Sequence, residues 1–148
     1  MSLTAKPHAT DRAAVRRTVV VANTPAAIFA LLADPHQHPD VDGSDSVRSV
    51  VEGPDRLVMG SVFRMQMKGY KTTNTVVEFA PDTLIAWQHR GRHVWRWELR
   101  AVEGGAEVTE TFDYTGKRGR ALVEFIGVPK RAGVALEQTL QKLQARFA

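Results

Sequence analysis

The spacing of hydrophobic and polar residues changes twice along the chain, and the changes divide it into three stretches. The first opens with 15–21 (VRRTVVV), whose β-branched residues predict a strand. The tripeptide 23–25 (NTP) offers a capping residue and a proline near the first helical position, so we predict a short helix over 26–33. The Asp-Pro pair at 34–35 ends that helix, and the polar segment 35–45 predicts loops and a short helical turn.

From residue 46 the apolar positions recur at every second residue, which is the period of a half-buried strand. Glycine, proline and aspartate separate the runs, and such short connections force neighbouring strands to be antiparallel. The six predicted strands of this stretch are 46–52, 57–68, 70–80, 83–90, 93–102 and 107–114.

The last thirty residues return to a helical spacing. Pro129 removes a backbone donor and disfavours helix at Val128, so we predict the main helix over 129–147 and a separate or kinked turn over 120–126. The apolar residues of the main helix lie largely on one stripe, which needs an apolar surface to cover. They are Val134, Leu136, Leu140, Leu143 and Phe147.

This order of elements predicts an α+β fold. A sheet of about seven strands is much wider than one helix, so a strongly curved antiparallel sheet that grips the long C-terminal helix is the expected solution. One or two short helices follow the first strand, and a cavity between sheet and helix is a natural consequence. In this interpretation residues 13–148 form a single domain, and residues 1–12 form a flexible N-terminal tail.

Four segments carry a family resemblance: 15–35, 38–44 (HPDVDGS), 104–114 (GGAEVTETFDY) and 136–148. Together they resemble the START-like (SRPBCC) superfamily of polyketide cyclases/dehydrases and lipid-transfer proteins, which has the helix-grip fold. The resemblance covers nearly the whole chain and consists of strand, turn and helix patterns. It implies a pocket for a hydrophobic or aromatic ligand such as a polyketide, a lipid or a quinone, in a superfamily that contains both enzymes and carriers.

Composition adds few constraints. The chain has 148 residues, of which 43% are hydrophobic, and it contains no cysteine, which excludes disulfides and thiolate metal sites. Its apolar runs are far too short for a transmembrane helix, and its first residues lack the apolar core of a secretory signal. We therefore expect a cytoplasmic protein, with a homodimer as a further expectation.

Charge is distributed unevenly around a net value of +4. The segment 34–55 is acidic, whereas 116–148 is rich in lysine and arginine. A basic surface can bind phosphate, so a nucleic-acid or membrane-surface binder is an alternative function. These basic residues are not interleaved with aromatic ones as in single-strand binders, so we do not expect nucleic acid as a partner.

The alternation within each strand predicts which side chains face the pocket. The inward sets are Trp95 with Trp97 and Leu99; Met59 with Phe63, Met65 and Met67; and Val108 with Glu110, Phe112 and Tyr114. Strand 83–90 is ambiguous. If residues 91–92 form a two-residue turn, Ala86 faces inward beside Trp97 and Trp87 stacks outside near Arg96, but one extra loop residue reverses this assignment.

We accordingly predict a pocket roofed by two leucines of the long helix. The predicted ligand-binding residues are Phe63, Met65, Met67, Trp95, Trp97, Glu110, Phe112, Tyr114, Leu136 and Leu140. Methionine and aromatic side chains suit an adaptable apolar site, although plain core packing is the alternative for each residue taken singly.

Glu110 is the strongest indication of a catalytic group, because a carboxyl on an apolar face needs a partner or a raised pKa. The alternative to a buried Glu110 is that the strand is bulged, or that Glu110 lies near the end of the strand and is exposed to water. If the protein is an enzyme of the cyclase/dehydratase type, the candidate catalytic residues are Glu110, Tyr114 and His38, with His36 and Arg64 as further candidates.

The segment His36-x-His38-x-Asp40-x-Asp42 is the one arrangement that resembles a metal site. Pro35 and Pro39 interrupt it, and no third ligand is evident elsewhere, so we expect loop and capping roles at the pocket mouth and no metal. No glycine-rich phosphate loop is present, so no cofactor is expected.

Overall fold

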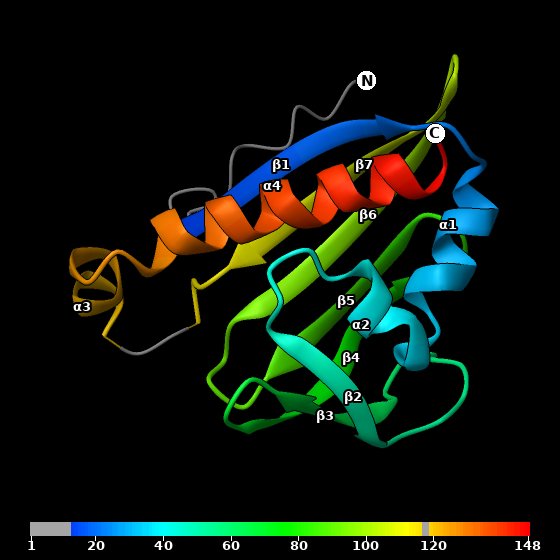
Figure 1. Cartoon of the computed structure of the whole chain (residues 1–148). Helices are drawn as coiled ribbons and strands as arrows, with labels where there is room; N and C mark the ends of the chain where they lie inside the picture. The colour runs from blue at the N-terminus through cyan, green and yellow to red at the C-terminus, as the bar shows by residue number, and fades with distance from the viewer. Residues whose placement is uncertain (1–12, 117–118) are drawn as a thin grey trace, which may run out of the picture.

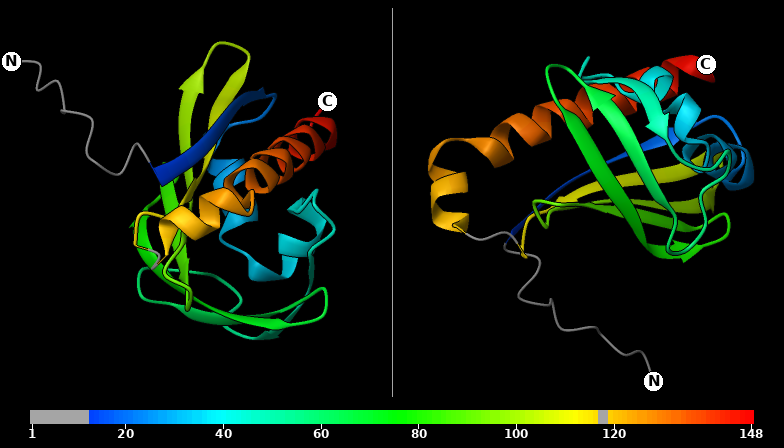
Figure 2. Two further views of the ribbon diagram at one scale, coloured as in Figure 1. Left: turned by 90° about the vertical axis from the view of Figure 1, so that its left-hand side faces the viewer. Right: turned by 90° about the horizontal axis from the view of Figure 1, so that it is seen from below.

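A long C-terminal helix lies along the concave face of a curved antiparallel sheet (Figures 1 and 2). The computed structural model describes residues 13–116 and 119–148. Its strands are β1 (Ala14–Val21), β2 (Val47–Glu52), β3 (Val62–Met67), β4 (Lys71–Ala80), β5 (Leu84–His89), β6 (Val94–Val102) and β7 (Gly105–Asp113). Its helices are α1 (Pro25–Leu32), the 3₁₀ turn η2 (Pro35–Gln37), α2 (His38–Val41), α3 (Arg120–Phe125) and α4 (Val128–Arg146). The predicted fold class is confirmed.

The seven strands pair in the order β1-β7-β6-β5-β4-β3-β2, and every pair is antiparallel. The six strands from β2 to β7 are sequential neighbours because their connections are short. β1 instead joins the far edge beside β7, so α1, η2 and α2 cross the open end of the sheet before β2 begins (Figure 1). The sheet bends between these edges, so that its concave face curves around α4 (Figure 2).

The first helical segment follows the capping signals of the sequence. The Thr24 hydroxyl accepts a hydrogen bond from the Ala27 N–H at 3.2 Å, and Pro25 occupies the first turn of α1. Asp34 then caps η2 by accepting from the His36 N–H at 3.0 Å. The predicted short helices after the first strand are therefore present.

The stripe of α4 that faces the sheet differs from the predicted one at its start. Val134 is half exposed, whereas the neighbouring Gly133 is buried. A Cβ atom at Gly133 would lie 2.9 Å from the Arg17 guanidinium and 3.4 Å from a Val15 methyl group, so β1 and α4 approach closely at this glycine. The prediction for Val134 was wrong because helical spacing alone does not reveal where a small residue allows this approach.

The third strand is shorter than predicted. The segment before Val62 is a turn in which the Ser61 N–H donates to the Val58 carbonyl at 3.0 Å. Met59 lies in this turn and is 60% exposed, so its predicted inward position was wrong. The Leu57 N–H instead donates to the Ala33 carbonyl at 2.7 Å, which ties this turn to the end of α1.

The ambiguous strand β5 is resolved by the loop that follows it. Residues 90–92 form a three-residue connection in which the His89 N–H donates to the His93 carbonyl at 3.1 Å and the Arg92 N–H donates to the His89 carbonyl at 3.0 Å. Arg92 has a left-handed φ of 68°. Trp87 therefore pairs with Trp95 and faces the concave side. The two-residue turn was the wrong alternative, and the extra loop residue reverses the face of every side chain in the strand.

On the outer face of the sheet, Arg96 does not stack on Trp87. Its guanidinium binds both Glu78 carboxylate oxygens, with a shortest distance of 2.7 Å, and lies 3.4 Å from Asp113. The predicted tail, residues 1–12, lies outside the described residues. Within the described ranges, no helix is long and apolar enough to cross a membrane.

Candidate functional site

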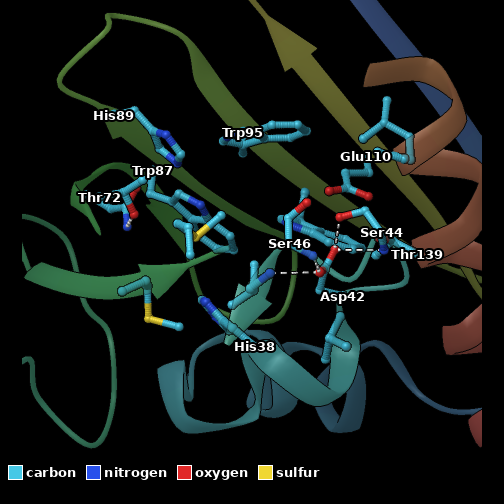
Figure 3. A pocket seen from close by; sticks show the side chains of 18 of the residues that line it. His38, Asp42, Ser44, Ser46, Thr72, Trp87, His89, Trp95, Glu110 and Thr139 are labelled. Atoms are coloured by element: carbon cyan, nitrogen blue, oxygen red, sulfur yellow. Dashed lines mark hydrogen bonds between the residues drawn. The ribbon is translucent and has the colours of Figure 1, made fainter. Parts of the chain in front are cut away.

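A cavity of about 290 Å³ lies between the concave face of the sheet, α4, and the segment from α2 to β2 (Figure 3). This volume is near the lower end of the range for small-molecule pockets. Its aromatic and apolar lining residues are Leu32, Val41, Val47, Phe63, Met65, Met67, Tyr70, Trp87, Trp95, Trp97, Ala135 and Leu136. Its polar lining residues are His38, Asp42, Ser44, Ser46, Thr72, Asn74, His89, His93, Glu110 and Thr139.

Three rings from separate elements form one wall of the cavity. The His38 imidazole of α2 stacks on the Trp87 indole, with ring centroids 4.7 Å apart and planes inclined by 23°. The Phe63 ring of β3 meets both edge-on, at 5.6 Å from His38 and 5.8 Å from Trp87. Such offset and edge-to-face contacts hold the rings rigidly, so α2 is fixed against the sheet at this point.

His38 is buried in this cluster as a neutral imidazole. Burial lowers the pKa of His38 to about 4, an effect that its hydrogen bond to the Leu32 carbonyl and the charge of Asp34 only partly oppose. Its Nε2 lies 2.7 Å from the Leu32 carbonyl oxygen. Because a carbonyl only accepts, Nε2 carries the proton and Nδ1 carries the lone pair. His38 therefore serves as a structural donor and not as an acid at neutral pH.

The loop after α2 is organised by the Asp42 carboxylate. One oxygen accepts from the Ser44 N–H at 3.0 Å and the Ser44 hydroxyl at 2.6 Å. The other accepts from the N–H groups of Ser46 at 2.9 Å and Val47 at 3.0 Å. Four donors on one side chain fix the path of the chain at the edge of the cavity, which agrees with the expected loop and capping role.

The same loop is attached directly to α4. The Gly43 N–H donates to the Thr139 hydroxyl at 3.0 Å, and the Lys142 ammonium donates to the Asp42 carbonyl at 3.0 Å. A Cβ atom at Gly43 would lie 2.3 Å from the Gln138 carbonyl oxygen, so only glycine allows this approach. The loop and the helix thus close one side of the cavity together.

Glu110 enters the cavity from β7 and is 6% exposed. Burial raises the pKa of the Glu110 carboxyl well above its usual value, and the negative charge of Asp42 raises it further. The cation nearest in register is Arg17 on β1, but its guanidinium binds Glu137 on α4 at 2.8 Å. A pKa raised in this way favours the protonated form of the Glu110 carboxyl, which can donate a hydrogen bond.

Three side chains of the lining each keep a buried polar atom without a hydrogen-bond partner within the described part of the chain. They are Asn74 at Oδ1, Trp97 at Nε1 and Glu110 at Oε2. Buried polar groups are satisfied in the great majority of cases, so such atoms in an apolar cavity call for a partner that enters it. The chemistry of the site is thus an apolar enclosure with a few defined polar points.

A histidine pair stands in the lining at the start and end of the β5–β6 loop. The Nε2 of His93 lies 2.9 Å from the Nδ1 of His89, so one ring donates and the other accepts. His93 also contacts the Trp95 ring, with centroids 6.2 Å apart. These two histidines were not predicted as site residues; their position on either side of the turn at 90–92 was the available signal.

Seven of the ten predicted ligand-binding residues are brought together around the cavity: Phe63, Met65, Met67, Trp95, Trp97, Glu110 and Leu136. The other three lie outside its lining. Phe112 and Tyr114 belong to a second apolar cluster with Val123 and Ala132, because α3 and the first turns of α4 cover that end of β7. Leu140, one turn after Leu136, is fully buried in the main core.

Of the other catalytic candidates, His38 lines the same cavity as Glu110, whereas Tyr114, His36 and Arg64 do not. The Tyr114 hydroxyl donates to Glu124 on α3 at 3.1 Å. His36 is exposed and lies 3.3 Å from Asp34, while Arg64 is exposed and 3.9 Å from Glu52. Among the described residues, no group of three or more histidine, aspartate or glutamate side chains is arranged to hold a metal ion.

Trp87, Asn74 and Thr139 are further lining residues that were not predicted from the sequence. The face of Trp87 was left open because the length of the loop after it was undetermined. Asn74 shares the parity of the buried Val76 in β4, so alternation alone could have placed it inward. Thr139 lies three residues after Leu136 on the helical stripe, which was a usable signal for a polar group on the buried face.

Two residues of the basic segment lie next to the cavity without lining it. No lysine or arginine is among the described residues that line the cavity, but Lys130 and Arg131 line an adjoining hollow that shares Ser44, Ser46 and Ala135 with it. Arg131 donates to the Ile126 carbonyl at 2.7 Å, so both it and Lys142 are used within the fold. Lys117 and Arg118 lie outside the described residues.

The curved sheet, the helix that it grips and the cavity between them define a helix-grip protein. The sequence matches the family model described as polyketide cyclase / dehydrase and lipid transport over residues 12–148, so the chain belongs to this family. The START-like resemblance seen in the sequence is therefore confirmed.

Two relatives from Mycobacterium tuberculosis are similar in sequence. Uncharacterized protein Rv0088 of strain H37Rv is 38% identical over 143 residues, which cover 90% of this chain and 64% of the relative. Uncharacterized protein MT0096 of strain CDC 1551 matches to the same extent. The chain thus spans 64% of the length of the curated relatives it matches.

Solved structures share the fold at low sequence identity. The solution structure of the KanY protein superposes with a TM-score of 0.72 at 19% identity, covering 90% of this chain and 96% of that one. The Aha1 dimer from Colwellia psychrerythraea gives 0.66 at 14% identity, covering 90% and 95%. Protein Ms6760 from Mycobacterium smegmatis gives 0.64 at 19% identity, covering 94% and 96%.

Proposed function

We propose that the protein binds one small hydrophobic or aromatic molecule, polyketide-, lipid- or quinone-like, in the cavity between the sheet and α4. The observation that carries the proposal is the cavity itself, which is walled by aromatic rings and methionine side chains from β3, β5 and β6. The wall offers large apolar contact area, and the methionines adapt to the shape of a guest. The family description, with its mention of lipid transport, supports the same reading.

A filling variant tests this proposal. Ala135 lies on α4 in the lining of the cavity, so a tryptophan at this position would occupy the space of the ligand. Ala145, on the same helix, is exposed and provides the matched control. N-phenylnaphthylamine, an uncharged probe whose fluorescence rises in apolar surroundings, reports binding without a known natural ligand.

We expect the wild-type protein and Ala145→Trp to bind the probe with equal affinity, and Ala135→Trp to bind it at least about tenfold more weakly because overpacking excludes the guest. Trp95→Ala should also weaken binding, since its ring lines the cavity. Circular dichroism checks that each variant is folded. If Ala135→Trp bound the probe as well as the wild type, the cavity would not be the binding site.

A second candidate function, catalysis of the cyclase/dehydratase type, is favoured by Glu110. Its carboxyl is buried, its pKa is raised, and its Oε2 has no hydrogen-bond partner among the described residues, so it could deliver a proton to a carbonyl or to a leaving hydroxyl of a bound chain. The enclosure would hold the chain in a reactive conformation. Incubation with a poly-β-ketone thioester, followed by mass spectrometry, tests for loss of water; the loss should disappear in Glu110→Gln, and its absence in the wild type would reject this candidate.

A further inference from the structure

Trp97 and Glu110 occupy directly opposite positions on β6 and β7 and point to the same face of the sheet. Side chains at such positions start from Cβ atoms about 5 Å apart. Both line the cavity, and both are at least nine-tenths buried. The Trp97 Nε1 and the Glu110 Oε2 have no hydrogen-bond partner within the described ranges.

Both groups can donate a hydrogen bond, and a protonated carboxyl can also accept one. The indole N–H of Trp97 is only a donor. Burial and the negative charge of Asp42 raise the pKa of the Glu110 carboxyl, which favours its protonated, donating form. Two adjacent donors that lack an acceptor form a cradle for one oxygen atom with two lone pairs.

The charges around the cavity restrict what can bring that oxygen. No lysine or arginine lines the cavity within the described residues, and Asp42 lies near Glu110. A carboxylate or phosphate would lose its hydration there without gaining a counter-charge, which is costly. A neutral carbonyl loses far less hydration free energy when it enters the cavity, and its oxygen accepts both hydrogen bonds.

We propose that Trp97 and Glu110 form a subsite for a carbonyl oxygen, so that the cavity selects uncharged apolar molecules bearing a ketone-type carbonyl over plain hydrocarbons and over carboxylates. This inference rests on the proposed function, because it requires a ligand in this cavity. Beyond the proposed function, it names the two residues that orient the ligand and the chemical class of ligand that they recognise. A ligand so oriented places its carbonyl beside β6 and β7 and its apolar body against Trp87 and Phe63.

Three rigid probes of nearly equal size separate these classes: fluorene, fluorenone and fluorenecarboxylate. Their affinities are measured by calorimetry or by quenching of the protein's tryptophan fluorescence. We expect fluorenone to bind at least about tenfold more tightly than fluorene, because fluorene leaves both buried donors without an acceptor and this costs binding free energy. The carboxylate should bind more weakly than either.

The variants assign the preference to the two residues. Trp97→Phe keeps the ring and removes the donor, and Glu110→Leu keeps the bulk and removes the acid; each should reduce the preference for fluorenone to within about threefold while fluorene still binds. Glu110→Gln retains a donor and should retain the preference. Glu98→Leu, on the exposed side of β6 beside Trp97, is the matched control and should behave as the wild type.

The outcomes distinguish this inference from the proposed function. Equal wild-type affinity for fluorene and fluorenone would overturn the carbonyl subsite and leave the apolar cavity intact, as would a preference that survives in both Trp97→Phe and Glu110→Leu. Carboxylate binding as tight as that of fluorenone would also overturn it. Binding of none of the three probes would overturn the proposed function and this inference together.

Discussion

Trp97 and Glu110 face each other across β6 and β7, and each has a buried polar atom without a partner within the described residues. An unsatisfied buried polar atom typically costs about 1–3 kcal/mol, so the pair lowers the stability of the empty protein. Backbone pairing fixes their relative position, which means that the donors are in place before a ligand arrives. Such preorganisation is typical of a binding site and is unnecessary in a core that only packs.

Replacing Glu110 by glutamine should stabilise the empty protein, and the gain should grow with pH. The pKa of Glu110 is raised in the folded state, so the unfolded chain loses this proton first as the pH rises above about 4.5. From that pH up to the folded pKa, the wild type loses stability that Glu110→Gln retains. Urea denaturation of both proteins at pH 4, 6 and 8 measures the difference.

His38 titrates in both proteins and cancels from this comparison. The exposed Glu98→Gln, on the neighbouring strand, controls for the loss of one carboxylate and should show no such growth. A constant difference between Glu110→Gln and the wild type across the three pH values would contradict the buried, protonated state of Glu110.

His38 should make the protein sensitive to acid over a different range. Its pKa is lowered from 6.5 to about 4, so its contribution to stability is fully present above pH 6.5 and is lost as the pH falls towards 4. The loss amounts to about 3 kcal/mol from a shift of this size. His38→Gln, which keeps a side-chain donor near the Leu32 carbonyl, should be less stable at pH 7 but should lack this step in urea denaturation between pH 6.5 and 4.

The tautomer of His38 gives an independent measurement. Nitrogen NMR chemical shifts of the imidazole should show a protonated Nε2 and an unprotonated Nδ1 from pH 8 down to pH 5. A fully charged ring at pH 5.5 would show that the stack with Trp87 does not exclude water from His38.

Gly43→Ala should separate the loop at 42–46 from α4. The added methyl group would lie 2.3 Å from the Gln138 carbonyl oxygen, so the loop must move and lose the hydrogen bond between the Gly43 N–H and Thr139. We expect a loss of about 2–4 kcal/mol in unfolding free energy. Binding of N-phenylnaphthylamine should weaken as well, because this loop closes one side of the cavity.

Gln138→Ala is the control on the other side of that contact. It shortens an exposed side chain but leaves the backbone carbonyl that Gly43 approaches, so its effect should stay within about 0.5 kcal/mol. Equal stabilities of Gly43→Ala and Gln138→Ala would show that the loop can shift without cost.

The chain alone determined the order of elements and the faces of most strands. The period of two across 46–114, the turn residues between the runs and the cap at 23–25 are local signals, and local geometry decides them. The faces of β3 and β6 followed from alternation once their centres were identified, so Phe63, Met65, Trp95 and Trp97 were placed inward correctly. The face of Glu110 was predicted in the same way.

The tertiary structure decided which inward residues share one cavity. The three-residue loop at 90–92 brought Trp87 to the inner face, a choice that depends on one residue of length and on the pairing of two strands. α4 approaches β1 closely at Gly133, and Leu140 of the same helix is buried in the main core. Phe112 and Tyr114 belong to the second apolar cluster, which α3 covers. The raised pKa of Glu110 likewise depends on tertiary structure, because the elements packed around the carboxyl bury it and the charge of Asp42 comes from another element.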